Sequence, residues 1–190
     1  RNHDVRAVQE QLVALGLSSL GRAESHVMAT VDAVLAHVTP ACHYATGARL
    51  SLKRRLALLQ WAESAGAWIV EDDYQGEFNY EARPPETLYS LDRGARVLHL
   101  GTFTNSMFPS LRLSYLVIPP SMCAVFEAVR AQLDDHTHGI SQAVLADFIN
   151  EGHFSAHLRR MRPIYRERRD ALLNACDRYL PQGTPGPALA

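Results

Sequence analysis

Cysteine, net charge and long apolar runs are all scarce in this sequence, and each shortage excludes a class of protein. The three cysteines, Cys42, Cys123 and Cys176, are widely separated and form no CxxC pair, so neither a disulfide framework nor a zinc site is expected. A net charge of -1 gives this segment no electrostatic reason to bind nucleic acid or an anionic membrane. No apolar run approaches the roughly 20 residues of a membrane span, and residues 1–4 do not lead into a signal peptide, so we expect a cytoplasmic protein.

Short apolar runs alternate with helical patterns, which is typical of an α/β fold with a mostly parallel central sheet and flanking helices. The 190 residues are 47% hydrophobic and 21% charged, enough for one sizeable core. Strands are predicted at about 34–39, 67–71, 97–100 and 113–118, with a further short strand at 17–20. No helical crossover separates the last two strands, so the final one is expected to run antiparallel to its neighbour. Helical patterns cover 4–16, 87–92, 121–133, 141–151 and 154–180.

The helix that precedes the second main strand has clear end signals. Ser51 is a typical N-cap, the helix is predicted to run through residue 65, and Gly66 is placed to end it. Leu52, Leu56 and Leu59 recur at helical spacing, so these three leucines are expected to face the core.

The last predicted helix is rich in arginine and contains a proline. Pro163 is expected to interrupt and kink this helix, because proline removes a helix hydrogen bond and clashes with the preceding turn. The arginines are interpreted as a solvated or subunit-facing surface rather than a nucleic-acid site.

Three consecutive carboxylates follow the second apolar run. Residues 67–70 are apolar and lead directly into Glu71, Asp72 and Asp73. Acids at the carboxyl end of a strand in an α/β sheet are more often functional than acids on a helix face. The run at 97–100 opens into residues 101–112, which are rich in small and hydroxyl side chains and end in Arg112. Hydroxyls, backbone N–H groups and a guanidinium bind phosphate, so we predict a ligand site where these two strands end.

A metal site is not predicted. Carboxylates and imidazoles crowd together in residues 134–138, but this segment is interpreted as a polar connection between two helices. No histidine lies near the acids at 71–73 in the sequence, and the later Glu77 and Glu81 match no familiar ligand spacing. Both observations disfavour a metal-dependent enzyme built on these acids.

These motifs, in this order, resemble the aminotransferase-like domain of MocR/GabR-type transcriptional regulators, within the fold-type I pyridoxal-phosphate (PLP) superfamily. The matching stretches are 71–78 (Glu-Asp-Asp-Tyr-Gln-Gly-Glu-Phe), 101–103 (Gly-Thr-Phe) and 109–115 (Pro-Ser-Leu-Arg-Leu-Ser-Tyr), followed by helical stretches at 145–149, 151–154 and 158–162. The likeness covers roughly residues 34–178. It implies a fold-type I PLP-dependent transferase-like fold, with an incomplete large domain over residues 1–150 and the start of the C-terminal small domain over 151–190.

The resemblance also implies roles for five residues. Asp72 would pair with the pyridine nitrogen of PLP, Tyr74 would bond the ring's phenolic oxygen, and the phosphate would be faced by Thr102, Thr104 and Arg112. A carboxylate beside the ring nitrogen keeps that nitrogen protonated, so the ring acts as an electron sink. Structural alternatives stay open: a cap for Asp72, a packed aromatic for Tyr74, and a salt bridge to one of the acids for Arg112.

One position departs from the family pattern. The family carries its Schiff-base lysine after a Gly-Thr-Phe-Ser motif, and here that position, 33 residues after Asp72, is Asn105. An asparagine amide is not a nucleophile and cannot hold PLP covalently. Lys53, in the first turn of a predicted helix, is the only lysine in the chain. No catalytic residue is therefore assigned, and the PLP site is expected to be weakened or lost.

The leading hypothesis is a truncated PLP-binding-type domain of such a regulator, without transaminase activity. It would respond to a small amino-acid or PLP-derived effector and form a homodimer, and it would contact neither nucleic acid through this segment nor a membrane. The alternative is a fragment of an active PLP-dependent aminotransferase, which requires a lysine at position 105. A third hypothesis is a dimerisation module that no longer binds PLP.

Overall fold

A computed structural model describes residues 34–43, 47–80, 86–133 and 139–180. The expected helix at 4–16, the expected strand at 17–20 and the polar segment at 134–138 lie outside these ranges. The described strands are β1 (Leu35–Val38), β2 (Trp68–Asp73), β3 (Val97–Thr102) and β4 (Ser114–Val117). The α-helices are α2 (Leu52–Ala65), α3 (Leu88–Leu91), α4 (Cys123–Leu133), α5 (Gly139–Asn150) and α6 (His153–Tyr179). Short 3-10 turns are η2 (Gly76–Phe78), η3 (Pro109–Leu111) and η4 (Pro120–Met122).

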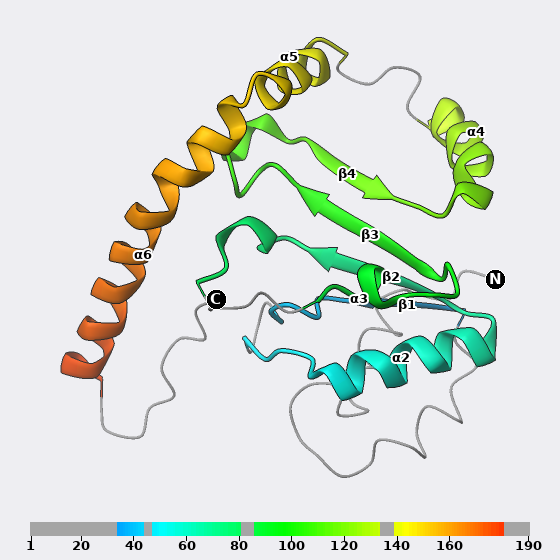
Figure 1. Ribbon diagram of the computed structural model, residues 1–190, viewed down its shortest axis with the longest axis horizontal. Helices are drawn as coiled ribbons and strands as arrows, with labels where there is room; N and C mark the ends of the chain where they lie inside the picture. Colours follow the sequence, from blue (N-terminus) through cyan, green and yellow to red (C-terminus); the bar gives the residue numbers. More distant parts are fainter. Residues whose placement is uncertain (1–33, 44–46, 81–85, 134–138, 181–190) are drawn as a thin grey trace.

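The strands form one mixed sheet in the order β1-β2-β3-β4 (Figure 1). β1, β2 and β3 are parallel to one another, and β4 runs antiparallel to β3. The short connection between β3 and β4 contains only η3, which leaves too little chain for a parallel crossover. The mostly parallel sheet and the reversed last strand are therefore confirmed.

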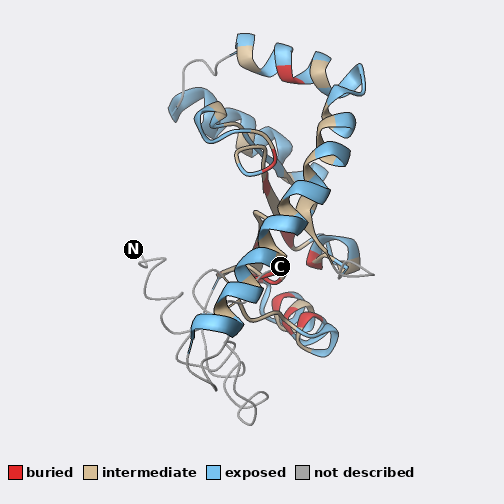
Figure 2. Cartoon of the chain, turned by 90° about the vertical axis from the view of Figure 1, so that its left-hand side faces the viewer, coloured by how far each residue is buried: buried red, intermediate tan, exposed pale blue. Residues whose placement is uncertain are grey.

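The described core lies between this sheet and helices α2 and α3. It is built from five fully buried residues, Leu58, Ala62, Ile69, Leu88 and Val97. Buried residues concentrate at this side of the molecule, whereas α4, α5 and α6 are largely exposed (Figure 2). The sheet face that carries Ile69 is thus the covered one.

Helix α2 has the predicted ends but a different inward face. The Ser51 side chain accepts a hydrogen bond from the N–H of Arg54, and Gly66 adopts the left-handed conformation at φ 64° that closes the helix. Leu52 and Leu56, however, are 54% and 50% exposed, so their predicted inward orientation is wrong.

The inward face of α2 is set instead by Arg55. This residue is 2% exposed, and its guanidinium donates to the carbonyl oxygens of Leu50 at 3.0 Å, Glu86 at 3.0 Å and Pro40 at 2.7 Å. A buried arginine is tolerated when its donors are satisfied. Arg55 and the buried residues Leu58 and Ala62 lie on one stripe of the helix, and this stripe turns the two outer leucines toward solvent.

Helix α6 runs without interruption for 27 residues and contains Pro163. The expected interruption at the proline is therefore wrong, and the kink expected there stays a prediction. The carbonyl that loses its helical partner belongs to Arg159, and both Arg159 and Pro163 are exposed, so this carbonyl is accessible to solvent. As Figure 1 shows, α6 passes along the side of the sheet where β2 and β3 end. Among the described helices, none is both long enough and apolar enough to cross a membrane.

Candidate functional site

The three consecutive acids lie within β2, which extends through Asp73 rather than ending at about residue 71. Side chains alternate between the two faces of a strand. Glu71 and Asp73 therefore share the face of Ile69, which α2 covers, and Asp72 lies on the opposite face. Strand register places Glu71 beside His99 and Asp72 beside Leu100.

Glu71 is a structural residue on the covered face. Its side chain is 1% exposed, and its carboxylate accepts hydrogen bonds from the backbone N–H groups of Leu88 at 2.7 Å and Tyr89 at 3.0 Å. The Nδ1 atom of His99 lies 3.1 Å from one carboxylate oxygen, and Arg55 Nη1 lies 3.9 Å from the other. The hydrogen bond to Glu71 raises the pKa of His99 above its ordinary value of 6.5. Glu71 thus holds α3, β3 and α2 together.

Sequence reasoning missed this histidine. His99 is 28 residues from Glu71 in the sequence, and parallel strand pairing brings the two side by side. The distance in the sequence therefore misled: the inference that no histidine lies near the acids is wrong in the folded structure. The alternating pattern of two predicted neighbouring strands was the signal that could have found His99. Even so, the described residues contain no group of three or more histidine, cysteine or acidic side chains arranged to hold a metal ion.

Asp72 and Asp73 have different surroundings. The Asp72 side chain is 27% exposed, and the Nε2 atom of His37 on β1 lies 3.4 Å from its carboxylate. Burial raises the pKa of Asp73 above 3.8, and its Oδ1 atom is buried with no hydrogen-bond partner among the described groups. Asp72 is therefore a partly accessible carboxylate, and it does not act as a cap in the described structure.

The hydroxyl-rich segment after β3 forms a compact turn. The Thr102 hydroxyl lies 3.4 Å from the Leu113 carbonyl and 3.2 Å from the Ser114 hydroxyl. The Thr104 N–H donates to the Thr102 hydroxyl at 3.2 Å. Thr102 is two residues beyond Leu100, the register partner of Asp72, so alternation puts Thr102 and Asp72 on the same face of the sheet.

Two side-chain contacts join the segments that follow the strands. Asn105 Nδ2 donates to the Tyr74 carbonyl oxygen at 2.9 Å, which links the ends of β3 and β2. The Tyr74 hydroxyl donates to the Cys42 carbonyl oxygen at 2.8 Å, which links the end of β2 to the loop after β1. Tyr74 is therefore hydrogen-bonded and not merely a packed aromatic.

Arg112 is exposed and adopts the left-handed backbone conformation, at φ 50°. Few residues other than glycine adopt this conformation, so the backbone at this position carries strain. Within the described ranges, no ion pair joins Arg112 to Glu71, Asp72 or Asp73. The alternative of a structural salt bridge to these acids is thus absent, and the convergence of Arg112 with Asp72 on one pocket stays a prediction.

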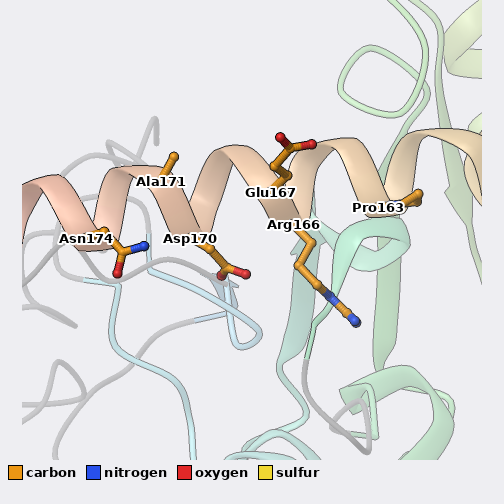
Figure 3. Close-up of a pocket in the computed structure, with 6 residues that line it drawn as sticks. All are labelled: Pro163, Arg166, Glu167, Asp170, Ala171 and Asn174. Atoms are coloured by element: carbon orange, nitrogen blue, oxygen red, sulfur yellow. The ribbon is translucent and has the colours of Figure 1, made fainter.

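A surface hollow of about 500 Å³ lies elsewhere, on helix α6 (Figure 3). Its lining residues all belong to that helix: Pro163, Arg166, Glu167, Asp170, Ala171 and Asn174. Figure 3 shows Arg166 and Glu167 pointing to opposite sides of the helix. A hollow on a single helix has no opposing wall, so the strand ends remain the better candidate site.

Residues 29–185 match the aminotransferase class I and II family. The chain belongs to this family. It is 42% identical over 146 residues to the probable rhizopine catabolism regulatory protein MocR of Rhizobium meliloti, and the matched segment is 77% of this chain and 30% of that protein. It is 43% identical over 141 residues to the HTH-type transcriptional regulator TauR of Rhodobacter capsulatus, covering 74% of this chain and 29% of that protein. The resemblance to the aminotransferase-like domain of MocR-type regulators is confirmed.

Solved aminotransferases share the fold. A kynurenine aminotransferase of Pyrococcus horikoshii, in complex with PMP, has a TM-score of 0.73 and 27% identity, covering 95% of this chain and 42% of that one. The α-aminoadipate aminotransferase LysN of Thermus thermophilus has a TM-score of 0.69 and 32% identity, and the match covers 77% of this chain and 38% of the LysN chain. The fold-type I PLP-dependent transferase fold is thus confirmed. The chain spans about three tenths of the length of the two regulators and about two fifths of the two enzymes.

Proposed function

We propose that this chain is the effector-sensing part of a cytoplasmic MocR/GabR-type regulator that holds PLP, or a PLP-derived amino-acid adduct, without a covalent anchor and without transaminase turnover. The observation that carries the proposal is the placement of Asp72. Its side chain shares a sheet face with Thr102, whereas the helix that bears the only lysine covers the other face.

In this proposal, hydrogen bonds and ion pairs hold PLP, and the first of them is made by Asp72. In the proposal Asp72 binds the protonated ring nitrogen, and its accessible carboxylate next to His37 suits that role. PLP supplies an electron sink when it is bound. The Asp72 carboxylate orients the ring and keeps the proton on its nitrogen, which is the contribution of the protein.

The phosphate end would be held by the segment after β3. The proposed ligands are the Thr102 hydroxyl, the Thr104 hydroxyl and the Arg112 guanidinium. The compact turn fixes the Thr102 hydroxyl next to a strand end, and its proton, donated to the Leu113 carbonyl in the described structure, would turn to the phosphate on binding. Arg112 is exposed and makes no ion pair with the three acids of β2, so its charge is available to an anion.

Tyr74 fits the proposed site only after a change of partner. Its hydroxyl donates to Cys42, and a bond to the ring's phenolic oxygen would compete with that contact. We therefore assign Tyr74 to the ring edge and expect a weaker contribution from it than from Asp72.

The covalent anchor does not fit this chain. Asn105 takes the position of the family's lysine, and its amide bonds the Tyr74 backbone. Lys53 is exposed in the first turn of α2, the helix that packs on the Ile69 face. Asp72 lies on the opposite face, so Lys53 is not placed to serve a ring held by Asp72.

The domain division is part of the same proposal. Residues 1–150 would belong to the large domain and residues 151–190 to the start of the small domain. Supporting this boundary, α5 ends at Asn150, and Gly152 adopts a left-handed φ of 80° immediately before the long helix α6.

Borohydride reduction followed by mass spectrometry tests the proposal on the full chain mixed with PLP. We expect no PLP adduct on Lys53, together with saturable PLP binding in an absorbance titration. An Asp72→Asn variant should bind PLP about 10- to 100-fold more weakly, because it loses a charge-assisted hydrogen bond worth roughly 1.5–3 kcal/mol. Glu127→Gln, on the exposed surface of α4, is the matched control.

A gain-of-function variant completes the test. Asn105→Lys in the full-length protein should allow trapping of PLP at position 105. A stoichiometric adduct on Lys53 of the unmodified chain would contradict the non-covalent proposal. Unaltered PLP affinity in Asp72→Asn would remove Asp72 from the site.

A further inference from the structure

Helix α6 makes a hydrogen bond to the turn that carries residue 105. The Nε2 atom of His157 lies 2.9 Å from the backbone carbonyl oxygen of Ser106. A carbonyl oxygen only accepts hydrogen bonds, so Nε2 must carry the proton. Ser106 is 2% exposed, and a buried carbonyl without this donor would lose its partner. The imidazole therefore donates its Nε2 proton to the backbone of the turn.

An aromatic contact joins the same helix to the other end of the turn. The rings of Phe154 and Phe103 meet edge to face, with centroids 5.7 Å apart. Phe154 and His157 are three residues apart, so they project from the same side of α6. Phe103 and Ser106 delimit the turn, which is closed by the N–H of Met107 bonding the Phe103 carbonyl at 3.0 Å. One side of the helix thus contacts both ends of the turn.

Further along, α6 also contacts the segment that follows β2. The Arg162 guanidinium donates to the Glu77 carbonyl at 3.1 and 3.2 Å. Tyr165 packs edge to face on Phe78 with centroids 4.8 Å apart. The two segments that carry the proposed site residues are therefore both held by one helix.

We propose that His157 is a positioning residue that fixes the 103–106 turn. The side chain at 105 is thereby held against the Tyr74 backbone, at the strand ends where PLP is proposed to bind. The Asn105 amide contact at 2.9 Å depends on where this turn lies. Because α6 also contacts the segment after β2, a shift of the helix moves both sides of the site together. Only the identity of the ligand rests on the proposed function, because the contacts themselves do not involve it.

Three variants of the full chain test the role of His157. His157→Ala removes the donor, whereas His157→Gln keeps an N–H at a similar reach. His153→Ala is the matched control, because its imidazole lies on the same helix and is 60% exposed. Amide hydrogen exchange of Met107 reports whether the turn stays closed, and far-UV circular dichroism reports whether α6 persists.

We expect His157→Ala to speed exchange at Met107 about 5- to 10-fold, the effect of losing one hydrogen bond to a buried group. His157→Gln should restore most of the protection, and His153→Ala should resemble the unmodified chain. Equal exchange in all four proteins, or no recovery in His157→Gln, would overturn the proposal.

A second measurement reads the position of residue 105 directly. In an Asn105→Lys background, borohydride trapping of PLP at position 105 should fall about 5- to 10-fold when His157→Ala is added, and recover with His157→Gln. Trapping that is insensitive to His157 would overturn the positioning role at the ligand. If the chain binds no PLP at all, the proposed function fails, and the exchange measurement alone decides the role of His157.

Discussion

Adjacent residues with the same chemistry have opposite roles in β2. Glu71 is 1% exposed and satisfied by backbone N–H groups of α3, whereas its neighbour Asp72 is 27% exposed and contacts His37 on the other face. A buried carboxylate is maintained only when its partners compensate for lost hydration. Glu71 therefore stabilises the fold, and Asp72 is the acid that we propose as a ligand contact.

At the residue scale, the titration of His99 predicts how stability depends on pH. Its hydrogen bond to Glu71 raises its pKa above 6.5. The protonated histidine thus contributes stability that is fully present below 6.5 and lost as pH rises through the folded value. Burial also raises the pKa of Asp73 and Glu77 above 3.8 and 4.5, so these acids too favour the folded state when protonated. The three groups act in the same direction.

We therefore expect the free energy of unfolding to be lower at pH 8 than at pH 6, and we expect a smaller difference in His99→Gln. Urea denaturation at the two pH values measures both. His153→Gln, whose exposed imidazole does not contact Glu71, is the control. An unchanged pH difference in His99→Gln would show that this histidine does not carry the effect.

At the element scale, the pairing of β3 with β4 depends on a glycine. Gly101 and Tyr115 are register partners, and a Cβ atom at position 101 would overlap the Tyr115 ring. The ring also packs near Phe103, at 5.3 Å between centroids, and near His99, at 6.3 Å. The absence of a side chain at Gly101 lets the tyrosine lie across the neighbouring strand.

Gly101→Ala should lower the free energy of unfolding by about 1–3 kcal/mol, because it forces Tyr115 out of its packing position. Tyr115→Ala combined with Gly101→Ala should cost less than the sum of the two single changes, since the clash is removed with the ring. Urea denaturation of the four proteins gives the coupling energy. Strict additivity would contradict the close approach. Gly94→Ala, on an exposed loop where a Cβ atom meets only ordinary contacts, is the control.

At the scale of the whole molecule, helices α4 and α5 present apolar side chains to solvent. Val125 is 59% exposed, Leu133 80%, Ile140 84% and Val144 63%. Exposed apolar side chains on a helix favour an interaction surface. The homodimer proposed for this chain accounts for this surface, as would a dimerisation module that binds no PLP.

The double variant Ile140→Lys/Val144→Lys tests dimerisation. The two residues are one helical turn apart, so charges there oppose close packing of a second copy. We expect the unmodified chain to sediment as a dimer and the variant as a monomer of similar thermal stability, because both side chains are already exposed in one chain. Gln142→Lys, on the opposite side of α5, should remain dimeric. A monomeric unmodified chain would rule out the homodimer.

Local signals determined much of this protein. The caps Ser51 and Gly66 marked both ends of α2, and four apolar runs marked the four described strands. The short link between the last two strands predicted the antiparallel direction of β4. These features depend on neighbouring residues, which is why the sequence contained them. The motifs around Asp72 and Thr102 likewise indicate the family through local sequence alone.

Packing between distant segments selects which side chains meet. Strand register paired His99 with Glu71 and put Asp72 on the opposite face, and no local pattern specifies register between distant segments. Arg55 entered the core because carbonyls from three separate segments satisfied it, which helical periodicity could not anticipate. The contact of His157 with the turn at residue 106 joins positions 51 residues apart. Such contacts arise from packing of whole elements, because the energy that selects them is shared among residues far apart in the chain.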